Sequence, residues 1–158
     1  MRAVLIVVVF IALVAVCSAD LYQQCSNGRS IDDLDSKVSV SSCTKAPCKL
    51  KKGTQSLVTM KFTPEKDLKR LRNTVFANIA GLPFPFIGVD NTNACGQIFE
   101  ADGTTKAACP LKAGVEYQYK NNIDVLPIYP TVKVVVHWGL TSEFGDEICF
   151  EVPARITN

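Results

Sequence analysis

Apolar and polar residues alternate in short stretches along this chain. In residues 56–62, Val58, Met60 and Phe62 share one face, and residues 148–156 alternate in the same way. This period of two predicts β-strands with one buried face. About seven such segments are separated by turns that contain Gly, Pro, Asn and Ser, and no convincing long helix interrupts them. The pattern therefore predicts one all-β domain, a sandwich of two antiparallel sheets.

Two of the predicted strands flank an unusual connection. Residues 115–120 and residues 132–138 each alternate with the period of a strand, so both should contact one core. Connections between strands usually run over the surface and are polar, but residues 121–130 are not. Either the protein's own core or a ligand should lie beneath their apolar side chains, which are Ile123, Val125, Leu126, Ile128 and Tyr129.

Proline and lysine modify the pattern at two further places. Residues 73–82 are apolar and continue into the sequence Pro-Phe-Pro-Phe at residues 83–86. Proline cannot donate to a sheet ladder, so this segment should lie at a sheet edge.

Residues 43–53 are predicted to form a hairpin. Its charges are typical of a solvated turn, and the alternative is a cationic knob for anionic membrane lipid, made of Lys45, Lys49, Lys51 and Lys52.

The first 19 residues predict a secretory signal peptide. An apolar run follows Arg2 and ends in small residues before Asp20, and it is shorter than the roughly 20 residues of a bilayer span. The mature domain, residues 20–158, should then be secreted or delivered into an endomembrane lumen. Loss of Arg2 would lower the formal charge from +2 to about +1, which does not fit a nucleic-acid-binding protein.

Six cysteines remain after residue 19, and an even number in an oxidising compartment predicts a disulfide framework. Spacing selects only in part among the pairings that six cysteines allow. It favours two short loops, which would leave a bridge between the ends of the domain: Cys43–Cys48, Cys95–Cys109 and Cys25–Cys149. A metal site is not expected, because there is no paired Cys-x-x-Cys motif and a single histidine.

The sequence offers no recognisable catalytic constellation. His137 falls on the outward face of a predicted strand, where it should be a solvent-facing or structural residue. Gly-x-Ser-x-Gly, His-Glu-x-x-His and glycine-rich phosphate loops do not occur, and bridged cysteines supply no thiolate. The chain is therefore not expected to be an enzyme, and no cofactor is implied.

Three blocks taken together resemble a known family. They are the sequence Cys-x4-Cys-x-Leu-x-x-Gly of residues 43–53, the Pro-Phe-Pro of residues 83–85, and residues 117–138 with Tyr129-Pro130 and Trp138. In this order they are similar to the soluble Niemann-Pick type C sterol carriers of the ML lipid-recognition domain family. The loop between Cys95 and Cys109 is longer than in vertebrate members and looks more like that of arthropod members.

The resemblance implies an immunoglobulin-like sandwich whose two sheets separate to hold a lipid in a cavity between them. It also implies the same three disulfides that the spacing favours. By position in the Pro-Phe-Pro motif it places a sterol-pocket residue at Phe84. By position in and before the Tyr-Pro motif it adds Val125, Tyr129 and Pro130, and Phe86 in the same proline-rich segment is a further candidate.

The hypothesis is a monomeric lipid carrier of the extracellular space or lysosomal lumen. It would bind a sterol or another apolar lipid and pass it to a membrane, with transient contact to anionic lipid, or to a membrane sterol transporter. One alternative is a carrier of fatty acids or semiochemicals, or a protein that recognises glycolipid patterns. Another, of a different class, is an extracellular interaction module with a filled core.

Overall fold

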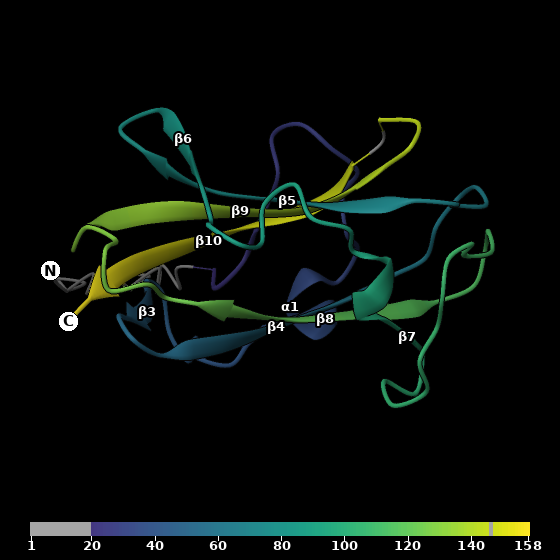
Figure 1. Ribbon diagram of the computed structural model, residues 1–158, viewed down its shortest axis with the longest axis horizontal. Helices are drawn as coiled ribbons and strands as arrows, with labels where there is room; N and C mark the ends of the chain where they lie inside the picture. Colours follow the sequence, from purple (N-terminus) through teal and green to yellow (C-terminus); the bar gives the residue numbers. More distant parts are fainter. Residues whose placement is uncertain (1–19, 146) are drawn as a thin grey trace, which may run out of the picture.

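The computed structural model describes residues 20–145 and 147–158. These residues form two β-sheets that lie face to face, with all elements arranged around one interior (Figure 1). The predicted signal peptide, residues 1–19, lies outside the described residues. Within the described part of the chain, no helix is long and apolar enough to cross a membrane.

The larger sheet has six strands and the smaller has four. The larger is ordered β1-β10-β9-β5-β6, with β3 also paired to β10, and the smaller is ordered β2-β4-β8-β7. The larger sheet contains β1 (Gln23–Gln24), β3 (Cys48–Lys51), β5 (Leu71–Ile79), β6 (Leu82–Pro85), β9 (Lys133–Ser142) and β10 (Glu147–Thr157). The smaller contains β2 (Val38–Val40), β4 (Gln55–Phe62), β7 (Ile98–Glu100) and β8 (Tyr117–Asp124). The short helices are α1 (Leu34–Lys37) and the 3-10 turn η1 (Cys95–Gln97).

The predicted all-β sandwich is confirmed, with ten strands rather than about seven. Strands β1 and β7 were not predicted, because segments of two and three residues are too brief to show a periodic pattern. All strand pairs are antiparallel except one, because β3 runs parallel to the end of β10.

The prediction of a hairpin at residues 43–53 is wrong. Strand β2 pairs with β4 in the smaller sheet, whereas β3 pairs with β10 in the larger. The chain therefore crosses between the sheets within this segment. Val40 and Leu50 are both buried, and they contribute to one core from opposite sheets, which is why apolar residues occur on both sides of the crossover.

The apolar connection between β8 and β9 has a similar explanation. Strand β8 belongs to the smaller sheet and β9 to the larger, so residues 125–132 run from one sheet to the other. Val125 is buried and Tyr129 packs against the core, as the sequence indicated. The preceding strand begins at Tyr117, so Val115, which was included in the predicted strand, lies before it and is 41% exposed.

The core is built from the inward positions of both sheets. In β4 the side chains of Val58, Met60 and Phe62 are buried, as the alternation predicted. Trp138 of β9 and Phe150 of β10 face them from the larger sheet and are 1% and 0% exposed.

Strand β6 is an edge strand, as its prolines predicted. It pairs with β5 alone, with Ala77 opposite Phe84 and Asn78 opposite Pro83. Because Pro83 and Pro85 have no amide hydrogen, they do not support a further strand on this side.

The three predicted disulfides are present. Cys25–Cys149 joins the N-terminal segment to β10, Cys43–Cys48 closes the crossover between the sheets, and Cys95–Cys109 closes the longer loop before β8.

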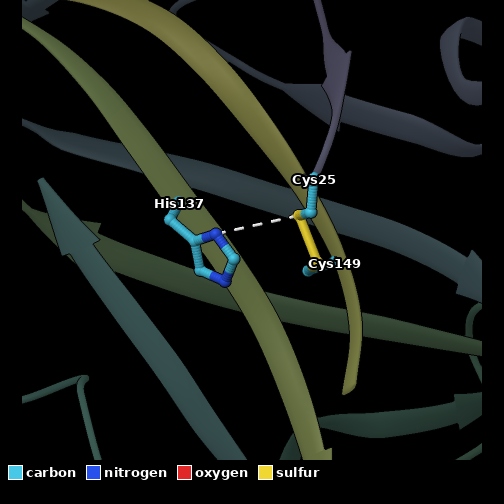
Figure 2. Close-up of side chains that lie close together, drawn as sticks. All are labelled: Cys25, His137 and Cys149. Atoms are coloured by element: carbon cyan, nitrogen blue, oxygen red, sulfur yellow. Dashed lines mark hydrogen bonds between the residues drawn. A yellow bond between two sulfur atoms is a disulfide. The ribbon is translucent and has the colours of Figure 1, made fainter. Parts of the chain in front are cut away.

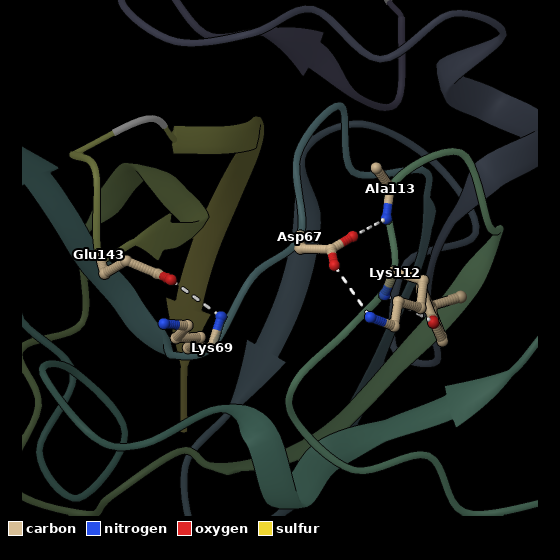
Figure 3. Close-up of polar contacts among 6 residues, drawn as sticks. Asp67, Lys69, Lys112, Ala113 and Glu143 are labelled. Carbon is tan, nitrogen blue, oxygen red and sulfur yellow. Dashed lines mark hydrogen bonds and ion pairs between the residues drawn. The ribbon is translucent and has the colours of Figure 1, made fainter.

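Two carboxylates hold the loops at the end of the sandwich where β9 finishes (Figure 3). Asp67 accepts a hydrogen bond from the Ala113 amide and pairs with Lys112 Nζ, both at 2.9 Å. Glu143 accepts from the amides of Lys69 and Arg70 at 2.9 and 3.1 Å. Hydrogen bonds to the charged form favour it, so these amides, with Lys112 beside Asp67, lower the pKa of both carboxyl groups.

Candidate functional site

The interior between the sheets contains a small cavity of ≈ 20 Å³. Ligand pockets for small molecules usually measure roughly 300 to 1,000 Å³. The sheets are therefore closed on each other in this structure, and a lipid could enter only if they moved apart. The lining comes from both sheets and is entirely apolar: Val40, Cys48, Leu50, Val58, Ile123, Val136, Trp138, Phe150, Val152 and Ala154.

Two of the five predicted site residues, Phe86 and Tyr129, are in contact. Their ring centroids lie 5.5 Å apart with the planes at 74°, an edge-to-face arrangement. The Ile87 amide donates a hydrogen bond to the Tyr129 hydroxyl at 3.0 Å. Phe86 is buried and Tyr129 is half-buried. The pair joins the segment after β6 to the β8–β9 connection.

The other three predicted residues lie apart from this contact in different environments. Phe84 is 47% exposed on edge strand β6, and Pro130 is exposed. Val125 is buried, with its amide donating to the Thr54 carbonyl at 2.9 Å and its carbonyl accepting from the Gly53 amide at 2.7 Å. None of the five predicted residues lines the cavity, so their role in a pocket stays a prediction.

Large apolar side chains are exposed in the two segments that Phe86 and Tyr129 join. Leu82 on β6 and Ile87 are each 62% exposed, and Ile128 is 80% exposed. Contiguous exposed apolar surface often marks an interaction site. These residues and Phe84 are called the apolar rim below.

A polar network lies inside the sandwich beside the cavity. Asn121 Nδ2 donates to the Tyr119 hydroxyl at 2.9 Å, and this hydroxyl donates to Asn73 Oδ1 at 2.7 Å. Burial raises the pKa of Tyr119, against the smaller opposite effect of the hydrogen bond from Asn121. The phenol is therefore neutral at physiological pH and acts as a fixed donor and acceptor.

His137 has the structural role, one of the two roles that the sequence left open. It lies on the outward face of β9, as predicted, but it is only 7% exposed. Its ring stacks on Phe76, with centroids 4.5 Å apart and an angle of 9° between the planes. Its Nδ1 lies 3.5 Å from Glu151 Oε1 and 3.7 Å from Cys25 Sγ (Figure 2). Phe76 on β5, Glu151 on β10 and Cys25 after β1 cover it, and a strand pattern alone does not reveal these neighbours.

Sequence reasoning missed the polar network and the neighbours of His137. The alternation placed Tyr119 on the inward face, but Asn73 comes from another strand and is 46 positions away. Such residues come together only because the two sheets pack face to face. No local signal in the sequence could have found them.

The sequence profile of the ML domain family matches residues 19–156. A crystal structure of a Niemann-Pick type C2 protein from Japanese carpenter ant has a similar fold, with a TM-score of 0.64 and 25% identity, and the match covers 89% of this chain and 96% of that chain.

Sequence relatives agree with this match. The ecdysteroid-regulated 16 kDa protein of Manduca sexta is 36% identical over 109 residues, which cover 69% of this chain and 70% of that protein. The NPC intracellular cholesterol transporter 2 of Bos taurus is 31% identical over 122 residues, covering 76% and 75%. The Drosophila melanogaster protein named NPC intracellular cholesterol transporter 2 homolog a is 33% identical, covering 76% and 78%. The chain therefore belongs to the ML domain family, with relatives among the Niemann-Pick type C2 proteins.

Proposed function

We propose that this protein carries a sterol between its two sheets and transfers it at an anionic membrane surface. The observation that carries the proposal is the cavity whose lining is apolar throughout and is supplied by both sheets. Two relatives are named as a cholesterol transporter and a homologue of one, which supports a sterol as the first ligand to test.

The proposed mechanism begins with separation of the sheets. The apolar tail of the sterol enters between them, and its hydroxyl stays near Phe84 and Tyr129, where water remains accessible. A ligand of about 28 heavy atoms that gains about 0.3 kcal/mol per atom would bind with about 8 kcal/mol, near micromolar affinity. No charged anchor inside the sandwich is needed.

The transfer step is supported by three cations at the same end of the larger sheet. Arg155 on β10 lies in register between Lys49 on β3 and Lys133 on β9. All three side chains are exposed, and no described side chain pairs with them. Like charges on adjacent strands destabilise a sheet, so this cation row is not explained by fold stability.

The cation row and the apolar rim could act together on a membrane. Lys133 is the first residue of β9 and directly follows the connection that contains Ile128. Each lysine or arginine near an anionic bilayer contributes about 1 kcal/mol of attraction, and exposed apolar side chains add contact with the acyl boundary. This arrangement would present the rim of the proposed pocket to the bilayer.

The small volume of the cavity favours a second candidate, an interaction module with a filled core. This candidate predicts that purified protein contains no extractable lipid and that lipids leave its melting temperature unchanged, because only a ligand that binds the folded state raises stability. A third candidate is a carrier of fatty acids, which would bind a fatty acid in the same cavity.

The decisive experiment is displacement of a fluorescent sterol from oxidised protein of residues 20–158, by cholesterol and by a fatty acid, near pH 7 and near pH 5. Displacement by cholesterol at micromolar concentration is expected. Displacement by the fatty acid alone would indicate that the protein is a general lipid carrier. Absence of any binding, together with absence of extractable lipid, would favour the filled core.

Two buried alanines provide a matched pair of variants. Ala154 is 2% exposed and lines the cavity, whereas Ala94 is 0% exposed and lies outside its lining. Ala154→Leu and Ala94→Leu should both reduce stability by overpacking, typically by about 1 to 3 kcal/mol. Only Ala154→Leu should weaken sterol binding. Equal affinity in both variants would show that the ligand binds elsewhere.

A further inference from the structure

Three side chains that can bind metals converge on the outer face of the larger sheet. The sulfur atoms of Cys25 and Cys149 and a ring nitrogen of His137 all lie within 4.8 Å of one another. Cys25 Sγ is 3.7 Å from His137 Nδ1, and Figure 2 shows this nitrogen directed toward the disulfide. The group lies on the opposite face of the sheet from the apolar cavity, so the proposed lipid site does not account for it.

The sheet register builds this cluster. Cys149 and Glu151 are two positions apart on β10 and share its outer face, and His137 on β9 is the register partner of Glu151. Cys25 follows directly after β1, which pairs with the other side of β10. The stacked ring of Phe76 fixes the plane of the imidazole. The donor atoms thus come from the neighbouring strands β9 and β10 and from Cys25, which directly follows β1.

We propose that reduction of the Cys25–Cys149 disulfide converts this cluster into a zinc site. Two molecules of a low-molecular-weight thiol reduce the disulfide to two cysteine thiols and are themselves oxidised to one disulfide. A Zn²⁺ ion then displaces both thiol protons to water and forms two Zn–S bonds and one Zn–N bond with His137 Nδ1. Glu151 is the nearest carboxylate for the fourth position.

The spacing of the donor atoms fits a tetrahedral zinc ion. Zn–S bonds of about 2.3 Å and Zn–N bonds of about 2.0 Å place sulfur and nitrogen about 3.5 Å apart, close to the 3.7 Å between Cys25 Sγ and His137 Nδ1. Glu151 Oε1 lies 3.5 Å from the same nitrogen. The two sulfur atoms must separate from bonding distance to about 3.8 Å.

The chemistry of the donors selects the metal class. Two thiolates and an imidazole suit Zn²⁺ and are poor ligands for Mg²⁺ or Ca²⁺, which prefer oxygen. Glu151 already contacts the ring nitrogen and is partly exposed, with 27% of its side chain accessible, so the site has a route to solvent. Because Cys149 and His137 are buried, little water can compete with them for the metal ion.

Zinc would preserve a connection that reduction removes. The disulfide ties the N-terminal segment to β10 across a sequence separation of 124. This segment covers the core through Tyr22, whose ring packs against Phe150 and whose hydroxyl accepts from the Val40 amide at 3.0 Å. A zinc ion between Cys25 and Cys149 would hold it in the reduced protein, and binding to the folded state alone would raise its stability.

The test uses the mature chain, purified oxidised, reduced with dithiothreitol and desalted without oxygen. Zn²⁺ is added, and each cysteine's alkylation by iodoacetamide is followed by peptide mass spectrometry. Zinc should slow alkylation of Cys25 and Cys149 by about tenfold or more, as expected for bound thiolates, and leave Cys95 and Cys109 unchanged. Co²⁺ added in place of Zn²⁺ should give the absorption bands of a tetrahedral thiolate site.

His137→Gln and Phe76→Leu are the paired variants. His137→Gln removes the nitrogen ligand and should abolish the protection and the Co²⁺ bands, whereas Phe76→Leu leaves every donor in place and should retain both. Circular dichroism of each oxidised and reduced sample identifies a variant that has unfolded, and Glu151→Gln then gives an independent check through weaker binding. Equal protection of all six cysteines, or protection that survives in His137→Gln, would overturn the proposal.

Discussion

Phe86 meets Tyr129 edge to face, with ring centroids 5.5 Å apart, and so connects the edge of the larger sheet to the β8–β9 connection. The same tyrosine accepts a hydrogen bond from the Ile87 amide. One side chain therefore supplies both the packing and the polar contact at this junction. If a lipid enters here, these two interactions must be broken first.

Tyr129→Phe tests the polar part of this junction. The ring contact with Phe86 should persist, and the Ile87 amide should lose its acceptor. Loss of one such hydrogen bond costs about 1 kcal/mol, which urea denaturation would measure. Sterol should also exchange faster in stopped-flow fluorescence, because less must be broken to separate the segments. Unchanged exchange with the expected loss of stability would place the entrance elsewhere.

Tyr119→Phe should be more costly, because it leaves a buried partner unsatisfied. Asn73 is 0% exposed and accepts the Tyr119 hydrogen bond at 2.7 Å. An unpaired buried group costs about 1 to 3 kcal/mol. Tyr117→Phe is the control, since the Tyr117 hydroxyl only accepts from the Lys112 amide, near the surface. Thermal unfolding that gives the two variants equal stability would contradict the importance of the buried network.

Acid should leave the loop of Asp102 intact until well below pH 4. The Thr105 hydroxyl and the amides of Thr105 and Thr104 donate to this carboxylate and lower its pKa to about 2. Since the folded pKa is lowered, the stabilisation is present above the ordinary pKa of about 3.9 and is lost as pH falls through the lowered value. An NMR titration of the Thr105 amide should therefore show a midpoint near 2, and a midpoint near 4 would contradict this assignment.

Asp67 and Glu143 should follow the same sign. Both have lowered pKa values, so the loops that they hold should remain ordered at pH 5. For the Asp102 titration described above, Asp102→Asn is the control. It keeps most of the shape of the side chain and should remove the titration from the Thr105 amide.

Charge reversal tests the cation row. Lys133→Glu replaces one attractive charge by a repulsive one, a change of about 2 kcal/mol on an anionic membrane, or more than about tenfold in vesicle affinity. Lys69→Glu is the matched control, because Lys69 is exposed beside Glu143, at the opposite end of β9. Cosedimentation with anionic and with neutral vesicles would measure both. An equal loss in the two variants would show that only net charge matters.

Much of the fold could be predicted from alternation and turn residues. Strand β4 matches its predicted segment, and the prolines at 83 and 85 identified an edge. The hairpin at residues 43–53 was predicted wrongly because a local pattern specifies which face of a strand is buried but not which sheet the strand joins. That choice depends on pairing with β10, about 100 residues away.

The candidate site shows a similar limit. The apolar connection indicated that Val125 and Tyr129 would contact the interior, and both do. The cavity lining was not predicted, since Trp138 and Ala154 resemble ordinary core residues in sequence. The sequence also left open whether His137 is solvent-facing or structural, because its neighbours come from β5, from β10 and from Cys25 after β1.

The crossover between β2 and β3 constrains how the two layers can part. Residues 52–54 are all that separates β3 from β4 in the other sheet, and the Cys43–Cys48 bridge shortens the link on the other side of β3. The other links that join the two sheets are longer, and they are residues 25–37, 63–70, 86–97 and 125–132. The short links on both sides of β3 hold the two sheets together along this margin, so we expect any widening of the sandwich to begin on the opposite side, near Phe86 and Tyr129.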